Sequence, residues 1–164
     1  MMEFFPSDPS REYSALAFDF GTQRIGVAYG QSLSGTAKAL RILPARDGIP
    51  DWDSVDSLLD EWNPDVLVVG LPYNMDDSHS ELQKRAEKFA ARLHGRFHKP
   101  CFGMDERLSS EAAREQIAKN GEGFSRDVRI DSVAAQLILE SWFAELRQRR
   151  QEARGAEGGK PGQP

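Results

Sequence analysis

The segment Ala15-Leu-Ala-Phe-Asp-Phe-Gly-Thr-Gln-Arg-Ile-Gly-Val-Ala28 is the part of the sequence that decides the fold. Its first six residues alternate as in a strand that is covered on both faces, and Gly21-Thr22 then begins a turn. Asp19 places a carboxylate in this apolar strand, and its removal from water is costly unless a cation or N–H donors compensate. We therefore expect Asp19 to face a metal ion or a basic partner, or to cap the turn by accepting hydrogen bonds from amides near Thr22.

Further apolar runs predict the other strands of the same sheet. Residues 24–31 and 36–43 have the composition of short strands, and the turn-prone residues 32–35 between them indicate an antiparallel meander. Residues 65–71 form a continuous apolar run, typical of a central strand, and residues 100–104 form a shorter one. The pattern predicts a mixed five-stranded sheet with three hairpin-linked antiparallel strands followed by two parallel strands.

Helical spacing of apolar residues accounts for most of the remaining chain. Asn63-Pro64 should end a first helix, whose N-cap is Asp51 or Asp53. In a second helix, Leu82 should lie on the buried apolar stripe. The two prolines in residues 44–50 interrupt the pattern. The predicted helices cover residues 52–62, 80–97, about 109–119 and 131–149, and a loop covers residues 120–126. An α/β fold with helices on both faces of the sheet follows.

Composition and charge limit the class of protein. A chain of 164 residues suits one domain, and its net charge of −5 argues against nucleic-acid binding unless a metal ion neutralises some of the acids. The N-terminus lacks the basic and apolar regions of a secretory signal, so we expect a cytoplasmic protein. Cys101 lies in an apolar context and is expected to be a small core residue rather than a nucleophile.

Acidic residues occur where predicted elements end or begin. Asp19 and Glu106 follow strands, at the edge where open α/β sheets place their sites, and Asp131 opens the last helix. Three convergent carboxylates would suit Mg²⁺ or Mn²⁺, and two such ions can activate water in phosphodiester hydrolysis. Taken singly, Asp131 could instead be a helix N-cap and Glu106 a surface charge. The three histidines and one cysteine match no standard zinc spacing.

Four blocks of the sequence resemble the YqgF/RuvX family of pre-16S rRNA nucleases and Holliday junction resolvase-like enzymes. The resemblance covers about residues 15–143, and the blocks are Phe18–Ala28, Val68–Asp76, Asp105–Ser109 and Ile130–Leu139. It implies an RNase H-like fold and a divalent-metal nuclease in which Asp19, Glu106 and Asp131 match the acidic triad. It also implies a role in maturing the 5′ end of 16S rRNA, with a further link to branched or single-stranded DNA.

The chain departs from the family pattern at two places. It has Asp76-Asp-Ser78 where the family commonly has Asp-Gly-Thr, and Gln23 where lysine is frequent. Neither departure touches the acidic triad. The resemblance makes Asn74, Arg107 and Arg24 candidates for positioning the substrate, although Arg24 could equally form a salt bridge with a neighbouring acid.

These expectations define the domain and its partners. Residues 14–150 should form the RNase H-like domain, residues 1–13 a flexible N-terminus and residues 151–164 a disordered tail. The expected partner is pre-16S rRNA, a ribosomal precursor or a DNA junction, and the protein should be a monomer or weak homodimer without membrane association. Candidate contacts to a nucleic-acid backbone, otherwise solubilising charges, are Lys84, Arg85, Lys88, Arg92, Arg147, Arg149 and Arg150.

Two other functions fit the sequence less well. The segment Asp19-Phe-Gly-Thr22 also resembles the phosphate-binding turn of actin-like and sugar-kinase ATPases, but those enzymes hold the nucleotide between two such domains, and this chain is long enough for one. A noncatalytic RNA-binding or ribosome-assembly module with the same fold is the other alternative. The complete acid set argues against it.

Overall fold

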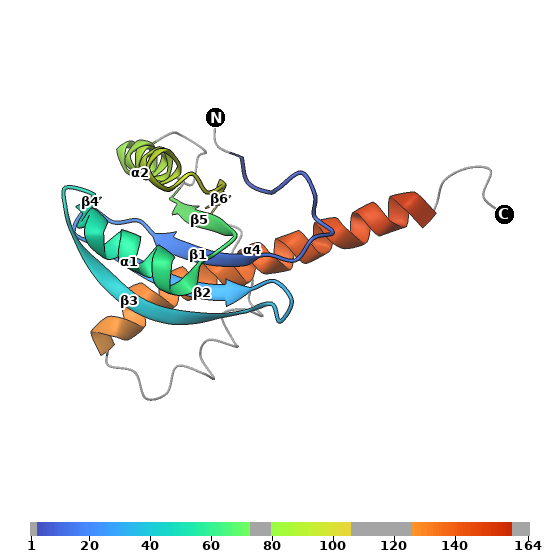
Figure 1. Cartoon of the computed structure of the whole chain (residues 1–164), viewed down its shortest axis with the longest axis horizontal. Coiled ribbons are helices and arrows are strands. Elements are labelled where there is room, and N and C mark those ends of the chain that lie inside the picture. The colour runs from blue at the N-terminus through green and yellow to red at the C-terminus, as the bar shows by residue number, and fades with distance from the viewer. Residues whose placement is uncertain (1–2, 73–79, 106–125, 159–164) are drawn as a thin grey trace.

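The computed structural model describes residues 3–72, 80–105 and 126–158. Within them one sheet contains six strands in the order β4-β3-β2-β1-β5-β6 (Figure 1). The strands are β1 (Ser14–Asp19), β2 (Arg24–Gln31), β3 (Thr36–Arg46), β4 (Ile49–Pro50), β5 (Val66–Leu71) and β6 (Cys101–Asp105). The helices are α1 (Trp52–Trp62), α2 (Glu81–Phe97) and α4 (Arg126–Gly158). The helix predicted over residues 109–119 lies outside the described residues.

The sheet has the predicted mixture of strand directions. Strands β1, β2 and β3 form an antiparallel meander, and β5 and β6 extend the sheet parallel to β1. The prediction of five strands was one short, because β3 continues to Arg46 and a tight hairpin adds β4. Asp47 and Gly48 have φ angles of 53° and 82°, and a turn with both central residues at positive φ matches the twist of a hairpin. The Asp-Gly pair was the missed signal.

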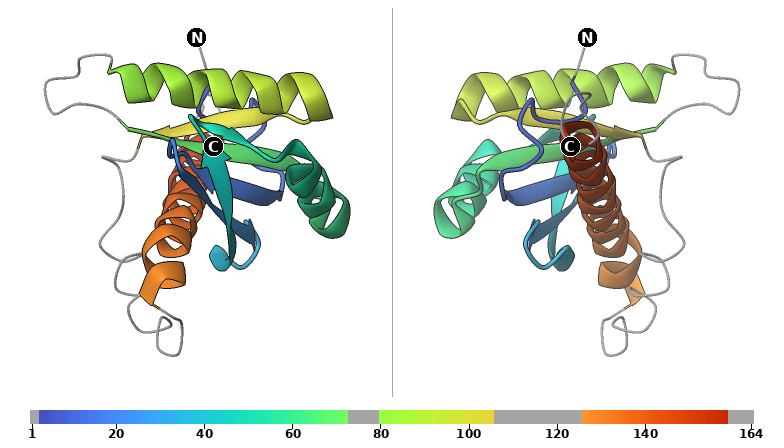
Figure 2. Two further views of the ribbon diagram at one scale, coloured as in Figure 1. Left: turned by 90° about the vertical axis from the view of Figure 1, so that its left-hand side faces the viewer. Right: turned by 90° about the vertical axis from the view of Figure 1, so that its right-hand side faces the viewer.

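Each face of the sheet has its own core. On one face, Leu16 and Phe18 of β1 and Phe20 directly after it pack with α1 and α2. On the other face, Ala15 and Ala17 pack with α4. Figure 2 shows α1 and α2 on one side of the twisted sheet and α4 on the opposite side. The alternation predicted for the first strand is therefore confirmed.

The helix ends follow the sequence signals, and the buried faces differ in detail. Ser80 caps α2, its Oγ accepting from the Gln83 N–H at 3.0 Å, and Asn63 ends α1 at a φ of 42°. Leu82 is exposed, and Gln83 occupies the buried position instead, so the predicted stripe was wrong at Leu82. None of the helices within the described residues is long and apolar enough to cross a membrane.

Helix α4 is longer at both ends than the predicted 131–149. It begins at Arg126 and continues to Gly158, so residues 151–158 extend the helix rather than starting a disordered tail. Alanine, glutamate and arginine, which favour helix, are frequent in this extension. Asp131 lies inside the helix and not at its start, so the interpretation of Asp131 as an N-cap was wrong.

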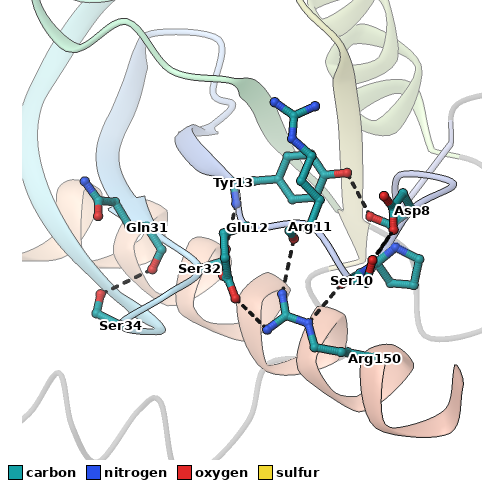
Figure 3. Close-up of polar contacts among 10 residues, drawn as sticks. Asp8, Ser10, Arg11, Glu12, Tyr13, Gln31, Ser32, Ser34 and Arg150 are labelled. Carbon is teal, nitrogen blue, oxygen red and sulfur yellow. Dashed lines mark hydrogen bonds and ion pairs between the residues drawn. The ribbon is translucent and has the colours of Figure 1, made fainter. Parts of the chain in front are cut away.

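The N-terminal segment, residues 3–13, packs against α4 and the outer edge of β6. The Gly103 N–H donates to the Glu3 carbonyl at 2.9 Å, and the Trp142 indole N–H donates to the Phe4 carbonyl at 2.8 Å. Arg150 donates to the carbonyls of Pro9 and Arg11 and forms an ion pair of 2.8 Å with Glu12 (Figure 3). Side chains far along the sequence thus bind the backbone of residues 3–13 and attach this segment to the domain.

Helix α4 also covers the free edge of β3. Gln136 donates its side-chain N–H to the Ala37 carbonyl at 3.0 Å, and the Ala37 N–H donates to the Glu140 carboxylate. The second carboxylate oxygen of Glu140, Oε2, is buried and has no hydrogen-bond partner among the described residues. These contacts occupy an edge that could otherwise pair with another chain.

Glu140 is expected to make the protein less stable as the pH rises. Burial raises the pKa of Glu140 above its ordinary value of 4.5 to about 7, so the folded chain holds a proton that the unfolded chain has lost. Between pH 5 and pH 8 this group should lower the free energy of unfolding by about 2 kcal/mol. Urea denaturation at both pH values should show that Glu140→Gln has lost this contribution, while Glu145→Gln on the same helix keeps the wild-type dependence. An equal loss of pH dependence in Glu140→Gln and Glu145→Gln would contradict the assignment of this dependence to Glu140.

Candidate active site

Asp19 is the last residue of β1 and lies at the carboxyl edge of the parallel strands. Its direct cross-strand partners are Gly26 on β2 and Gly70 on β5. Paired residues share a face of the sheet, so the two positions directly opposite the half-buried Asp19 carry no side chain. Glycine at both positions keeps this part of the sheet edge free of bulky directly opposite side chains.

The same edge receives the ends of β5 and β6. Leu71 pairs with Asp105, the last residue of β6, one position beyond the level of Asp19 and Gly70. Asp19 belongs to the face that α4 covers, because it alternates with Ala15 and Ala17. In Figure 1 the arrowhead of β1 and the first, orange turns of α4 lie at the same end of the molecule. The fold thus brings the ends of three strands and the start of α4 to one edge.

The structure places only part of the predicted site. Arg24 is exposed at the start of β2, two residues from Gly26 and therefore on the same face as Asp19. Asp131 is within the first two turns of α4, and its side chain is not among those described. Glu106, Arg107 and Asn74 lie outside the described residues. The convergence of the three acids stays a prediction.

The turn after Asp19 is closed tightly by Gly21. A Cβ atom at this position would lie 2.5 Å from the carbonyl oxygen of Arg24, which is closer than side chains tolerate. Glycine is therefore required by the close approach of two backbone segments. The chain therefore reverses direction close to Asp19, and residue 21 places no side chain over this carboxylate.

The remaining reactive groups offer no competing site in the part of the chain that the structure describes. Burial raises the pKa of the Cys101 thiol to about 12, so the thiolate is scarce near neutral pH. The thiol packs against the core of the α1 and α2 face, as predicted for a core residue. No three His, Cys, Asp or Glu side chains in the described ranges are grouped to hold a metal ion.

Several arginines that were candidate nucleic-acid contacts make contacts within the protein. Arg85 of α2 forms an ion pair with Asp47 at 2.6 Å. Arg149 lies over the Phe5 ring, 4.1 Å from its centroid, and Arg150 holds the N-terminal segment. The sequence does not distinguish an arginine that contacts the protein itself from one that contacts a nucleic acid, because both occur as basic residues on a polar helix face.

Comparison with known proteins identifies the family. The family model described as "RuvX: Holliday junction resolvase" matches residues 13–145, most of the chain. The chain belongs to the RuvX family. Relatives carrying the name "Putative pre-16S rRNA nuclease" include one from Chromohalobacter salexigens, 58% identical over 132 residues, covering 79% of this chain and 88% of the relative. Another, from Saccharophagus degradans, is 52% identical over 129 residues, covering 78% of this chain and 91% of the relative.

Solved structures agree with this family at the level of fold. The structure described as Thermus thermophilus RuvC in complex with Holliday junction substrate aligns with a TM-score of 0.54 at 13% identity, covering 84% of this chain and 96% of that one. A second Thermus thermophilus RuvC structure has a TM-score of 0.51 at 11% identity, with the same coverage of both chains. The RuvX chain therefore has the RNase H-like fold that its sequence predicted. The N-terminal segment before Tyr13 and the end of α4 lie outside the matched family region.

Proposed function

We propose that this RuvX-family protein is a divalent-metal nuclease that hydrolyses phosphodiester bonds in RNA and matures the 5′ end of pre-16S rRNA in the cytoplasm. The observation that carries the proposal is Asp19, a carboxylate at the carboxyl edge of the sheet with glycine on both neighbouring strands. The names of relatives above 50% identity support the choice of substrate. The family description and the RuvC-like fold support a nuclease in the wider sense.

The residues of this edge suit a hard divalent ion. Asp19 supplies a carboxylate oxygen, the ligand type that Mg²⁺ and Mn²⁺ prefer, and its direct cross-strand partners are both glycine. Glu106 and Asp131 are proposed to complete the ligand set. When bound, such an ion lowers the pKa of a water molecule and stabilises negative charge on the phosphate oxygens.

The remaining proposed residues act on the substrate. Arg24 is exposed on the face of Asp19, where its guanidinium can bind a phosphate oxygen through two N–H groups. Asn74 and Arg107 are proposed to position the neighbouring nucleotides. The closed turn at Gly21 keeps the backbone compact between Asp19 and Arg24. In this arrangement Arg24 holds the phosphate next to the carboxylates, as hydrolysis requires.

Cleavage of a 5′-extended 16S rRNA precursor tests this function. The purified protein should cut the precursor near the mature 5′ end with Mn²⁺ or Mg²⁺, lose activity in excess EDTA and regain it when metal is restored. Matched single-stranded DNA and a four-way DNA junction should be cut more slowly. Binding of the RNA without cleavage under all metal conditions would contradict a nuclease. Faster cleavage of the DNA junction than of the RNA would contradict rRNA as the preferred substrate.

A further inference from the structure

We propose that the β3–β4 corner, residues Ala45–Gly48, is a positioning element that holds the turn after Asp19 in its active geometry. The inference rests on the proposed function, because it concerns the geometry of the same edge. The corner is far from Asp19 in the sequence, but it contacts the residues that directly follow this carboxylate. Its contacts involve the backbone of the turn, the Phe20 ring and helix α2.

The corner binds the turn through two backbone hydrogen bonds. The Gly48 N–H donates to the Thr22 carbonyl at 2.8 Å, and the Ala45 N–H donates to the Gln23 carbonyl at 2.8 Å. Two successive peptide groups of the turn are thus oriented from outside the turn. Because a peptide unit is planar, fixing each carbonyl also fixes the direction of the following N–H group. The turn cannot rotate these peptides without breaking bonds to the corner.

Gly48 also determines where the Phe20 ring lies. Gly48 is buried at a φ of 82°, and a Cβ atom added to it would be 2.8 Å from Cζ of Phe20. The ring is buried and packs on Phe89 of α2, with 5.4 Å between the ring centroids. Phe20 directly follows Asp19, and packing on Phe89 limits how far its ring can turn, so we expect a displaced ring to strain the end of β1.

Helix α2 holds the corner from a second direction. Arg85 donates to Asp47 at 2.6 Å, and it lies one turn of helix before Phe89. The same helix therefore contacts the tip of the corner and the ring beneath it. The ion pair is exposed and adds little to global stability, so its main effect is local. The corner, Phe20 and α2 together form a support for the end of β1.

The substitution Gly48→Ala tests the support directly. Alanine at this positive φ is strained and its Cβ meets the Phe20 ring, so hydrogen exchange of the amides of residues 45 and 48, which donate to the turn, should become about tenfold faster in the metal-free protein. In the RNA cleavage assay kcat should fall about a hundredfold with KM unchanged, because a misplaced catalytic group slows chemistry more than binding. The matched control is Gly95→Ala in α2, where nothing lies within 4 Å of the added Cβ, and both readouts should remain at wild-type values.

A milder variant keeps the test decisive if Gly48→Ala does not fold. Arg85→Gln removes the ion pair from an exposed position and should accelerate exchange of the amides of residues 45 and 48 by a smaller factor. Exchange rates equal to those of Gly95→Ala in the folded variants would overturn the positioning role. If the wild-type protein cleaves no RNA, the proposed function fails. In that case the positioning role is tested by amide exchange and by calorimetric Mn²⁺ binding. Values of both in Gly48→Ala equal to those of the wild-type protein would overturn it.

Discussion

Asp19→Asn is expected to lower the rate of RNA cleavage by about a hundredfold or more while the protein stays folded. A divalent ion supplies several kcal/mol of transition-state stabilisation, and each 1.36 kcal/mol corresponds to about a tenfold change in rate. An amide is a neutral and weaker ligand of Mg²⁺ or Mn²⁺ than a carboxylate. The substitution preserves size, and Asp19 has only glycines as direct cross-strand partners, so the surrounding packing should persist. Cleavage rates at increasing Mn²⁺ and Mg²⁺ concentrations measure the effect.

The matched control for this variant is Asp65→Asn. Asp65 is exposed directly before β5, at the end of the sheet opposite to Asp19, and accepts from the Ser14 N–H at 3.0 Å. The same chemical change there should leave the cleavage rate at its wild-type value. Circular dichroism spectra of both variants should match that of the wild-type protein. Equal cleavage by Asp19→Asn and the wild-type protein would eliminate Asp19 as a metal ligand.

Trp142→Ala is expected to lower the free energy of unfolding by about 3–5 kcal/mol, which is the usual cost of truncating a large buried aromatic side chain. Trp142 is 0% exposed and lies at the centre of the core between α4 and the sheet. Its ring stacks on Phe5 and Phe102, each with 5.9 Å between ring centroids. Its indole N–H also donates to the Phe4 carbonyl. The substitution therefore removes core packing and one attachment of the N-terminal segment together.

Urea denaturation followed by far-ultraviolet circular dichroism measures this loss. Trp62→Ala is the control, because Trp62 is half-buried at the end of α1. Its ring is tilted against that of Tyr29, with 4.7 Å between the ring centroids, away from the α4 core. This substitution should destabilise the protein less. Trp142→Phe should recover part of the packing but not the hydrogen bond to Phe4. A free energy of unfolding for Trp142→Ala within 1 kcal/mol of wild type, roughly the size of a single hydrogen bond, would contradict the central position of this ring.

The strands next to the candidate site could be predicted because their signals are local. Alternation in residues 15–20 and the apolar run before Gly70 are direct consequences of which face each residue occupies. The β3–β4 corner was missed because a strand of two residues has no periodicity to detect. Its Asp47-Gly48 pair carried a hairpin signal that the neighbouring prolines obscured. Only part of the candidate site could therefore be placed beforehand.

The arrangement of the two chain ends was not predicted, for two different physical reasons. Proline and serine near the N-terminus have low helix and strand propensity, whereas residues 151–158 combine glycine with the alanine, glutamate and arginine that continue helix α4. Residues 3–13 are held by contacts with residues more than one hundred positions away, such as those of Glu12 with Arg150 and of Phe4 with Trp142. Local composition contains no record of such partners.

The sequence by itself determined the RNase H-like fold, the position of Asp19 at a strand end and the membership of the RuvX family, because strand alternation and motif order are properties of neighbouring residues. Only the tertiary structure decided which residues lie next to Asp19 and the turn that follows it. Gly26 and Gly70 become its partners through strand register, and Gly48 reaches the following turn through a hairpin 25 residues or more along the chain. Register and long-range packing depend on the energy of the whole assembled sheet, and no single segment specifies them.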